Sequence, residues 1–154
     1  MRNPALAALL RLSSVVVVAV SLVACSSPGT SSASPSSGGS ATTVNVTLTE
    51  FKVEFDSMTV PAGEVTFDVK NDGTVVHEFV VFRTDLAEDA LPEASDAPEV
   101  DEADSSLESM GEVEDVEVGA SKSFTATLTP GSYVAICNVA GHYDSGMHIH
   151  FTVS

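Results

Sequence analysis

Alternation of apolar and polar residues with a period of two is the feature that most restricts what this chain can fold into. Such alternation is typical of half-buried β-strands, because successive side chains of a strand point to opposite faces of the sheet. The pattern recurs in short runs at residues 44–48, 51–55, 65–69, 124–128 and 149–153. The apolar parity changes between Leu48 and Phe51, which predicts a bulge or a strand break there.

Turn sequences separate these runs and set the fold class. Turns of Gly, Pro, Asn and Asp are found at Pro61-Ala62-Gly63, Asn71-Asp72-Gly73 and Pro130-Gly131. Residues 75–82 are more continuously apolar, which predicts a strand buried on both faces. Many short strands joined by such turns predict an all-β antiparallel sandwich or barrel, and residues 41–154 are expected to form it as one domain.

One acidic segment interrupts the strand pattern. Residues 85–117 carry 14 of the 22 Asp and Glu residues of the chain, with Leu, Ala and Pro scattered between them. The segment is long for a loop. We expect a solvated acidic excursion with about one helical turn; the alternative is an acidic docking surface for a basic partner.

The N-terminal residues predict export. Arg2 and Arg11 flank the start of a short apolar run that ends in Leu22-Val23-Ala24-Cys25, as in a secretory signal peptide. The ending resembles the lipobox of bacterial lipoproteins, which implies cleavage after residue 24 and a lipid on Cys25. The alternatives are an uncleaved anchor, or an ordinary secreted protein with a stray cysteine. Residues 25–40 are rich in Ser, Gly and Pro and predict a flexible linker between the lipid and the domain.

The charge of the chain restricts its partners. The net charge is −16, and removal of Arg2 and Arg11 with the signal leaves four Lys and Arg against 22 Asp and Glu, or −18. Nucleic acid is excluded as a partner, because phosphate contacts need clustered basic residues. A basic protein partner is favoured by electrostatic attraction. The membrane is reached only through the lipid on Cys25, since an acidic domain does not dock onto anionic lipid.

The chemistry of the chain is concentrated in residues 133–147. Cys137, His142 and Met147 follow one another at intervals of five residues, in a loop between two expected strands. If Cys25 carries lipid, Cys137 has no disulfide partner, and a metal bond would protect its thiol in an oxidising compartment. Two histidines, one cysteine and a weak axial methionine are the ligand set of a blue-copper site. His77, in the strand after the Asn-Asp-Gly turn, is the candidate for the second histidine.

Each of these residues also has a purely structural interpretation. His77 on an apolar strand could be a hydrogen-bonded buried histidine, and Met147 could be a core residue. Cys137 could be an inert buried thiol. All three structural interpretations would have to be true at once, and His142 would have to occur in the same loop by coincidence. His148 and His150 have the opposite parity to the apolar residues of the last strand, so we expect them to face away from the site, into water.

Residues 71–82 and 133–151 together resemble the two copper-binding segments of bacterial cupredoxins, the plastocyanin and azurin superfamily. The resemblance implies a Greek-key β-sandwich of about eight strands that holds one copper ion through His77, Cys137, His142 and Met147. Two departures are visible. The interval between Cys137 and His142 exceeds that of plastocyanins, and Glu78 stands where many members have an asparagine that braces the copper loop.

Three functions remain open on this basis. The first is single-electron transfer by a monomeric, exported cupredoxin, with a basic redox protein such as a cytochrome domain as its partner. The second is binding of copper for storage, sensing or delivery at the cell envelope, and the third is a metal-free interaction module. We find no constellation of nucleophile and base, so no enzymatic activity is expected.

Overall fold

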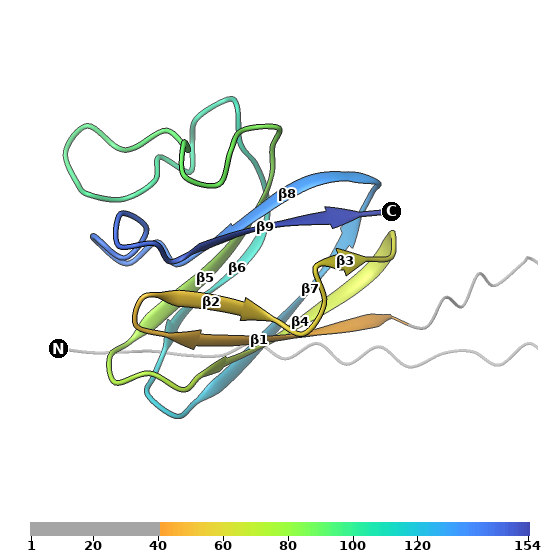
Figure 1. Cartoon of the computed structure of the whole chain (residues 1–154), viewed down its shortest axis with the longest axis horizontal. Helices are drawn as coiled ribbons and strands as arrows, with labels where there is room; N and C mark the ends of the chain where they lie inside the picture. The colour runs from red at the N-terminus through yellow and green to blue at the C-terminus, as the bar shows by residue number, and fades with distance from the viewer. Residues whose placement is uncertain (1–40) are drawn as a thin grey trace, which may run out of the picture. The chain divides into compact units, whose positions relative to one another are not determined.

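Two β-sheets packed face to face form the part of the chain that the computed structural model describes, residues 41–154 (Figure 1). The first sheet has the strand order β2-β1-β4-β7, with bounds β1 (Thr42–Thr49), β2 (Lys52–Phe55), β4 (Gly63–Asn71) and β7 (Ser121–Leu128). The second has the order β3-β9-β8-β5-β6, with bounds β3 (Thr59–Val60), β5 (His77–Arg83), β6 (Glu108–Val116), β8 (Gly131–Ile136) and β9 (His148–Val153).

The strands expected from the alternating runs are confirmed, and the parity change after Leu48 is the turn between β1 and β2. Two strand pairs, β1 with β4 and β3 with β9, are parallel rather than antiparallel. This arises because the chain crosses to the second sheet at β3 before it returns to the first at β4. The signal peptide, the linker and Cys25 lie outside the described residues, and within residues 41–154 no helix could cross a membrane.

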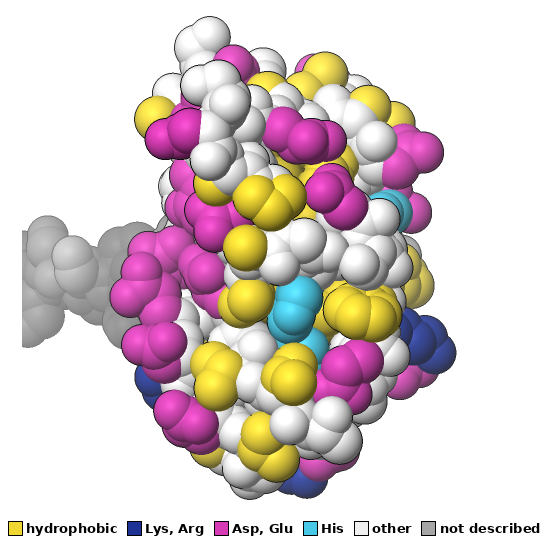
Figure 2. Space-filling view, turned by 90° about the vertical axis from the view of Figure 1, so that its left-hand side faces the viewer, with side chains coloured by type: hydrophobic (Ala, Val, Ile, Leu, Met, Phe, Trp, Pro, Cys, Tyr) yellow, Lys and Arg dark blue, Asp and Glu magenta, His cyan; other side chains and the backbone are white. Residues whose placement is uncertain are grey.

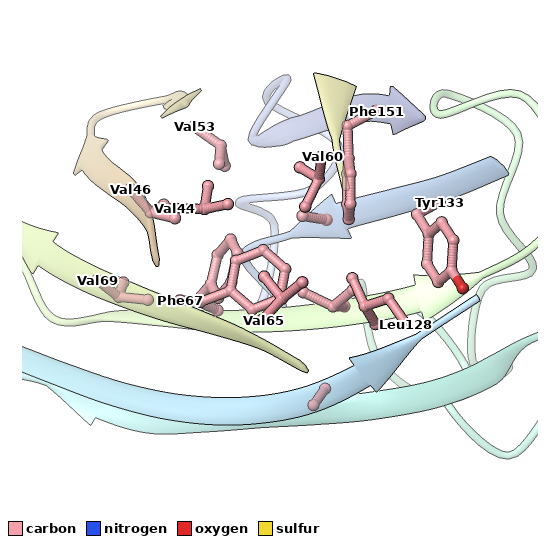
Figure 3. Close-up of a cluster of buried hydrophobic side chains, with 14 of the residues drawn as sticks. Val44, Val46, Val53, Val60, Val65, Phe67, Val69, Leu128, Tyr133 and Phe151 are labelled. Carbon is pink, nitrogen blue, oxygen red and sulfur yellow. The ribbon is translucent and has the colours of Figure 1, made fainter. Parts of the chain in front are cut away.

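Aromatic side chains join the two sheets in the core between them. The Phe67 ring, on β4, lies 5.7 Å from the Phe79 ring of β5 and 6.0 Å from the Phe151 ring of β9, and Figure 3 shows Phe67 and Phe151 among the buried valines. Tyr133 stacks on Phe151 and donates a hydrogen bond from its hydroxyl to the Thr129 carbonyl. Tyr133 is therefore a core residue.

Strand β5 is buried on both faces, which confirms the prediction made from its continuously apolar sequence. Phe79 and Val81 face the core between the sheets. Val80 and Phe82 face the other side, where a second apolar cluster covers the outer surface of the sheet. The segment between β5 and β6 supplies part of that cluster through Leu91, Val100 and Leu107, and Figure 1 shows its green loops beyond the end of β5.

The acidic segment 85–117 thus differs from the expected solvated loop in two ways. Its last part, Glu108–Val116, is strand β6, which raises the strand count from about eight to nine. Register shifts in the β5–β6 pairing, and the positive φ of 48° at Asp115, break the period of two and hide this strand in the sequence. The first part packs on the sheet through its few apolar residues, while its acids are exposed or partly exposed. It contains turns and a bridge between Glu93 and Val100 instead of a helical turn.

The packing of this segment can be tested with two valines. Val100 is 3% exposed and Val118 is 53% exposed. Val100→Ala should lower the free energy of unfolding by about 2 kcal/mol, because it removes buried methyl groups and leaves a cavity. Val118→Ala should change it by less than about 0.5 kcal/mol. Denaturant unfolding of both variants gives the comparison, and equal values would show that the segment does not pack on the sheet.

Candidate metal centre

The candidate ligands meet at one end of the sandwich. His77 is the first residue of β5, Cys137 directly follows β8, and Met147 directly precedes β9. The Cys137 amide donates to the Met147 carbonyl over 2.9 Å, which extends the β8–β9 pairing beyond the strand ends. Residues far apart in the sequence are therefore fixed at this end by the neighbouring strands β5, β8 and β9.

Three donor atoms converge at this end. The Nδ1 atoms of His77 and His142 are 3.2 Å apart, and the Cys137 Sγ atom lies 3.7 Å from the first and 3.3 Å from the second. Three donors at about 2.0–2.3 Å from one ion in a trigonal plane would lie about 3.5 Å from one another. His77, Cys137 and His142 are thus brought together as the sequence predicts. The side chain of Met147 is fully buried beside them in the core cluster.

Burial acts in opposite ways on the two kinds of donor. Burial lowers the pKa of His77, and the neighbouring His142 lowers it further. Burial also lowers the pKa of His142, so both imidazoles are neutral and can offer a lone pair. Burial raises the pKa of the Cys137 thiol, which therefore stays protonated until a metal ion replaces its proton.

The loop between β8 and β9 turns back tightly to present His142 and Met147. Gly141 and Gly146 adopt positive φ angles of 76° and 101°, a region that glycine enters without steric cost. The Met147 amide donates to the His142 carbonyl over 3.0 Å. These turns explain why two glycines lie within the ligand loop.

The Cys137 sulfur also accepts a hydrogen bond from the chain. The Glu78 amide donates to Sγ over 3.3 Å, so the main chain makes this contact whatever side chain stands at position 78. The Glu78 carboxyl lies near those of Glu112 and Glu114. Burial, and the charges of Glu102, Glu112 and other nearby glutamates, raise the pKa of Glu78 to about 7.

Asn138 braces the ligand loop, a role that its place in the sequence does not reveal. Its side-chain oxygen accepts a hydrogen bond from the Val100 amide over 2.8 Å, and its amide group donates to the Val100 carbonyl and the Glu102 carboxylate. The loop makes two further links to the same acidic segment: Gly141 donates to the Pro98 carbonyl, and the Tyr143 hydroxyl accepts from the Leu91 amide. The segment therefore holds the loop in place.

The approach to His77 is shaped by two more polar residues. The buried Asn71 side chain donates to the carbonyls of Val75 and Val116 and accepts from the Gly73 amide. The Glu50 carboxylate accepts from the Thr74 and Val75 amides. Hydrogen bonds from the Thr74 amide and from the main chain of Glu50 itself are the chief causes that lower the pKa of Glu50 to about 2, and Val75 and His77 add smaller contributions.

His148 and His150 lie apart from the metal-ligand group, in agreement with the strand parity, but only His150 faces water. The His148 ring packs 5.3 Å from the Tyr143 ring, and its Nδ1 lies 3.9 Å from a Glu88 oxygen. The expectation that both histidines are solvated is therefore wrong for His148. Tyr143 of the ligand loop and Glu88 of the acidic segment lie against this ring, which the alternation of β9 alone could not reveal.

An apolar rim surrounds His142 at the surface. Phe51, 49% exposed, meets the His142 ring edge-on with 5.6 Å between ring centres. Val139 and Ala140, three and two residues before His142 in the ligand loop, are at least partly exposed. Figure 2 shows histidine side chains at the middle of this end, between hydrophobic side chains and with acidic ones around them.

The donor set fits a soft, monovalent or divalent metal ion. Three electron-rich atoms face one another within the protein, and only the sulfur has a main-chain partner. They lie at hydrogen-bonding distance from one another, and a cation placed between them would accept a lone pair from each. Imidazole and sulfur donors suit copper in both of its common oxidation states.

Comparison with known proteins agrees with this fold. The sequence matches the family described as "Cupredoxin-like domain" over residues 15–150. Among curated proteins, none matches the sequence. The auracyanin of the photosynthetic bacterium Roseiflexus castenholzii is 26% identical over 75% of this chain and 99% of its own, with a TM-score of 0.56.

Two further structures are similar. Auracyanin B is 26% identical over 74% of this chain and 89% of its own, with a TM-score of 0.52. Auracyanin A of Chloroflexus aurantiacus, described as a "blue" copper protein, is 23% identical over 74% of this chain and 99% of its own, with a TM-score of 0.54. With the family match spanning most of the sequence, the chain belongs to the cupredoxin-like domain family.

Proposed function

We propose that this protein is an exported electron carrier that binds one type 1 copper ion through His77, Cys137, His142 and Met147. The observation that carries the proposal is the convergence of two imidazole Nδ1 atoms and one thiol sulfur within 3.2–3.7 Å of one another. The similarity to auracyanin A, a "blue" copper protein, supports it.

The four residues have distinct roles in this proposal. His77, Cys137 and His142 would hold the ion as its three strong ligands, and Met147 would add a weak thioether ligand. A copper ion held there would supply one-electron chemistry between Cu(I) and Cu(II). The residues themselves keep their positions, because strands and hydrogen bonds fix them, and a fixed ligand set lowers the rearrangement that accompanies the change of charge.

Electron transfer is favoured over storage, sensing or delivery of copper by the burial of the site. His77 and Cys137 are fully buried, and the ligand loop is braced by Asn138 and Tyr143. Delivery requires ligands that open readily to a copper acceptor. His142 is the ligand that reaches the surface, inside the apolar rim, and there a redox partner can approach the metal without removing it.

The ligand role of Cys137 is testable by colour. The Cu(II)-loaded wild-type protein should be intensely blue through thiolate-to-copper charge transfer, and Cys137→Ser should lose the blue band. Met147→Leu is the control: it removes the other sulfur but keeps the thiolate, so it should stay blue and bind copper. Visible and EPR spectra of the three proteins decide the matter, and a blue Cys137→Ser protein would refute the assignment.

The partner is proposed from charge. Four Lys and Arg against 22 Asp and Glu leave −18 on the chain after signal removal, and acids surround the apolar rim (Figure 2). Such a surface attracts a basic redox protein, for example a cytochrome domain. The apolar rim is small, which suits a brief contact with that partner, and the chain is expected to act as a monomer.

Electron transfer to a cationic redox protein should therefore slow as salt rises, because the screening length is only about 8 Å at physiological ionic strength. Stopped-flow rates with one cationic and one anionic protein over a salt series measure this. Asp89→Asn with Glu93→Gln, both exposed acids of the acidic segment, should slow the cationic reaction. Glu64→Gln with Asp68→Asn, exposed acids on β4, form the matched control. A salt-independent rate would exclude steering.

The protein is further proposed to be a lipoprotein on the outer face of the cell membrane or in the periplasm, anchored through Cys25. The support is the apolar run that ends in Leu22-Val23-Ala24-Cys25. Cys25→Ala should release the protein to the soluble exported fraction or leave its signal uncleaved. Cell fractionation and mass spectrometry of the N-terminal peptide measure this, and an unmodified Cys25 in the mature wild-type chain would contradict it.

A further inference from the structure

The second ring nitrogen of His77 has an unusual neighbour. Nδ1 points to the metal centre, and Nε2 is fully buried without a hydrogen-bond partner of normal length. The Glu50 Oε1 atom lies 3.5 Å from Nε2. Glu50 belongs to the turn between β1 and β2, outside both segments that supply metal ligands, so its approach to His77 is a property of the fold.

The Glu50 carboxylate is held at this place by the main chain. The same oxygen accepts hydrogen bonds from the Thr74 amide and, over 3.0 Å, from the Val75 amide. These amides belong to the turn that leads into β5 and His77. The carboxylate and the imidazole are therefore attached to one turn, which fixes their relative position.

Gly73 makes the close approach possible. A Cβ atom at this position would lie 2.5 Å from the Glu50 oxygen, 2.9 Å from the His77 Nε2 and 3.1 Å from the Asn71 side-chain oxygen. Contacts below 3.0 Å do not occur between real atoms of this kind, so only glycine fits. The Asn-Asp-Gly sequence thus serves the Glu50–His77 contact as well as the turn.

We propose that Glu50 is a positioning residue that fixes the proton of His77 on Nε2 and lowers the reduction potential of the copper centre. A neutral imidazole that binds metal through Nδ1 carries its proton on Nε2, and Glu50 is the acceptor for that proton. A carboxylate behind a histidine ligand raises the ligand's basicity. Its negative charge also stabilises Cu(II) relative to Cu(I). The inference rests on the proposed function.

The first test is the reduction potential of copper-loaded Glu50→Gln. Glutamine keeps an oxygen for the Thr74 and Val75 amides but removes the charge. Cu(II) binding should weaken about tenfold, which for one electron raises the potential by about 59 mV if Cu(I) binding is unchanged. Glu54→Gln, an exposed acid on the adjacent strand β2, is the charge control and should leave the potential nearly unchanged. Equal shifts in both variants would overturn the proposal.

The second test needs no metal and separates this inference from the copper assignment. Two-dimensional ¹H–¹⁵N spectra of the metal-free wild-type protein should show His77 as the Nε2–H tautomer. In Glu50→Gln the ¹⁵N shifts of His77 should move, while Glu54→Gln leaves them in place. An Nδ1–H tautomer in the wild type, or unchanged shifts in Glu50→Gln, would overturn the role of Glu50. Failure of the wild type to bind copper would instead refute the proposed function.

Discussion

Three donor atoms must be held within 3.2–3.7 Å of one another for one metal ion to reach all of them, and this constraint organises the end of the sandwich where His77, Cys137 and His142 meet. The surrounding structure must supply the restraint. Strands β5 and β8 set two of the donors, and the loop before β9 sets the third.

The restraint comes from two sides of the site. On one side, Asn71 and Glu50 tie the turn before β5 to neighbouring main chain, so His77 enters its strand at a fixed angle. On the other, Asn138 links the first residues of the ligand loop to Val100 in the acidic segment. Apart from the local contact of Asn71 with Val75, these hydrogen bonds join residues that are more than 20 positions apart in sequence. The site is thus a product of tertiary packing, although its donors are visible in the sequence.

The sequence was sufficient for those features whose signal is local. Alternation identifies a strand wherever one face is buried and the other solvated, and soft donors at regular intervals in one loop indicate a metal. Strand β6 was not predicted, because the register shifts in its pairing with β5 move its apolar residues out of the period of two. The packing of Leu91, Val100 and Leu107 on the sheet could not be predicted, because three apolar residues so widely spaced show no periodicity. Glu50 and Phe51 could not be assigned to the site, since only the folded chain brings them to His77 and His142. Asn138 lies next to Cys137 in the sequence, but only the folded chain brings Val100 to its side chain.

Strand β6 has one more consequence, for solubility. It forms an edge of the second sheet, and an open edge is a template on which another chain can add a strand. Bulges in its pairing with β5 and exposed glutamates at positions 108, 112 and 114 make the edge irregular and negatively charged. Two copies that approach through this edge repel each other and find no straight row of donors and acceptors. The irregularity that hid β6 in the sequence therefore protects the folded chain from aggregation, which matters most where many copies are crowded together.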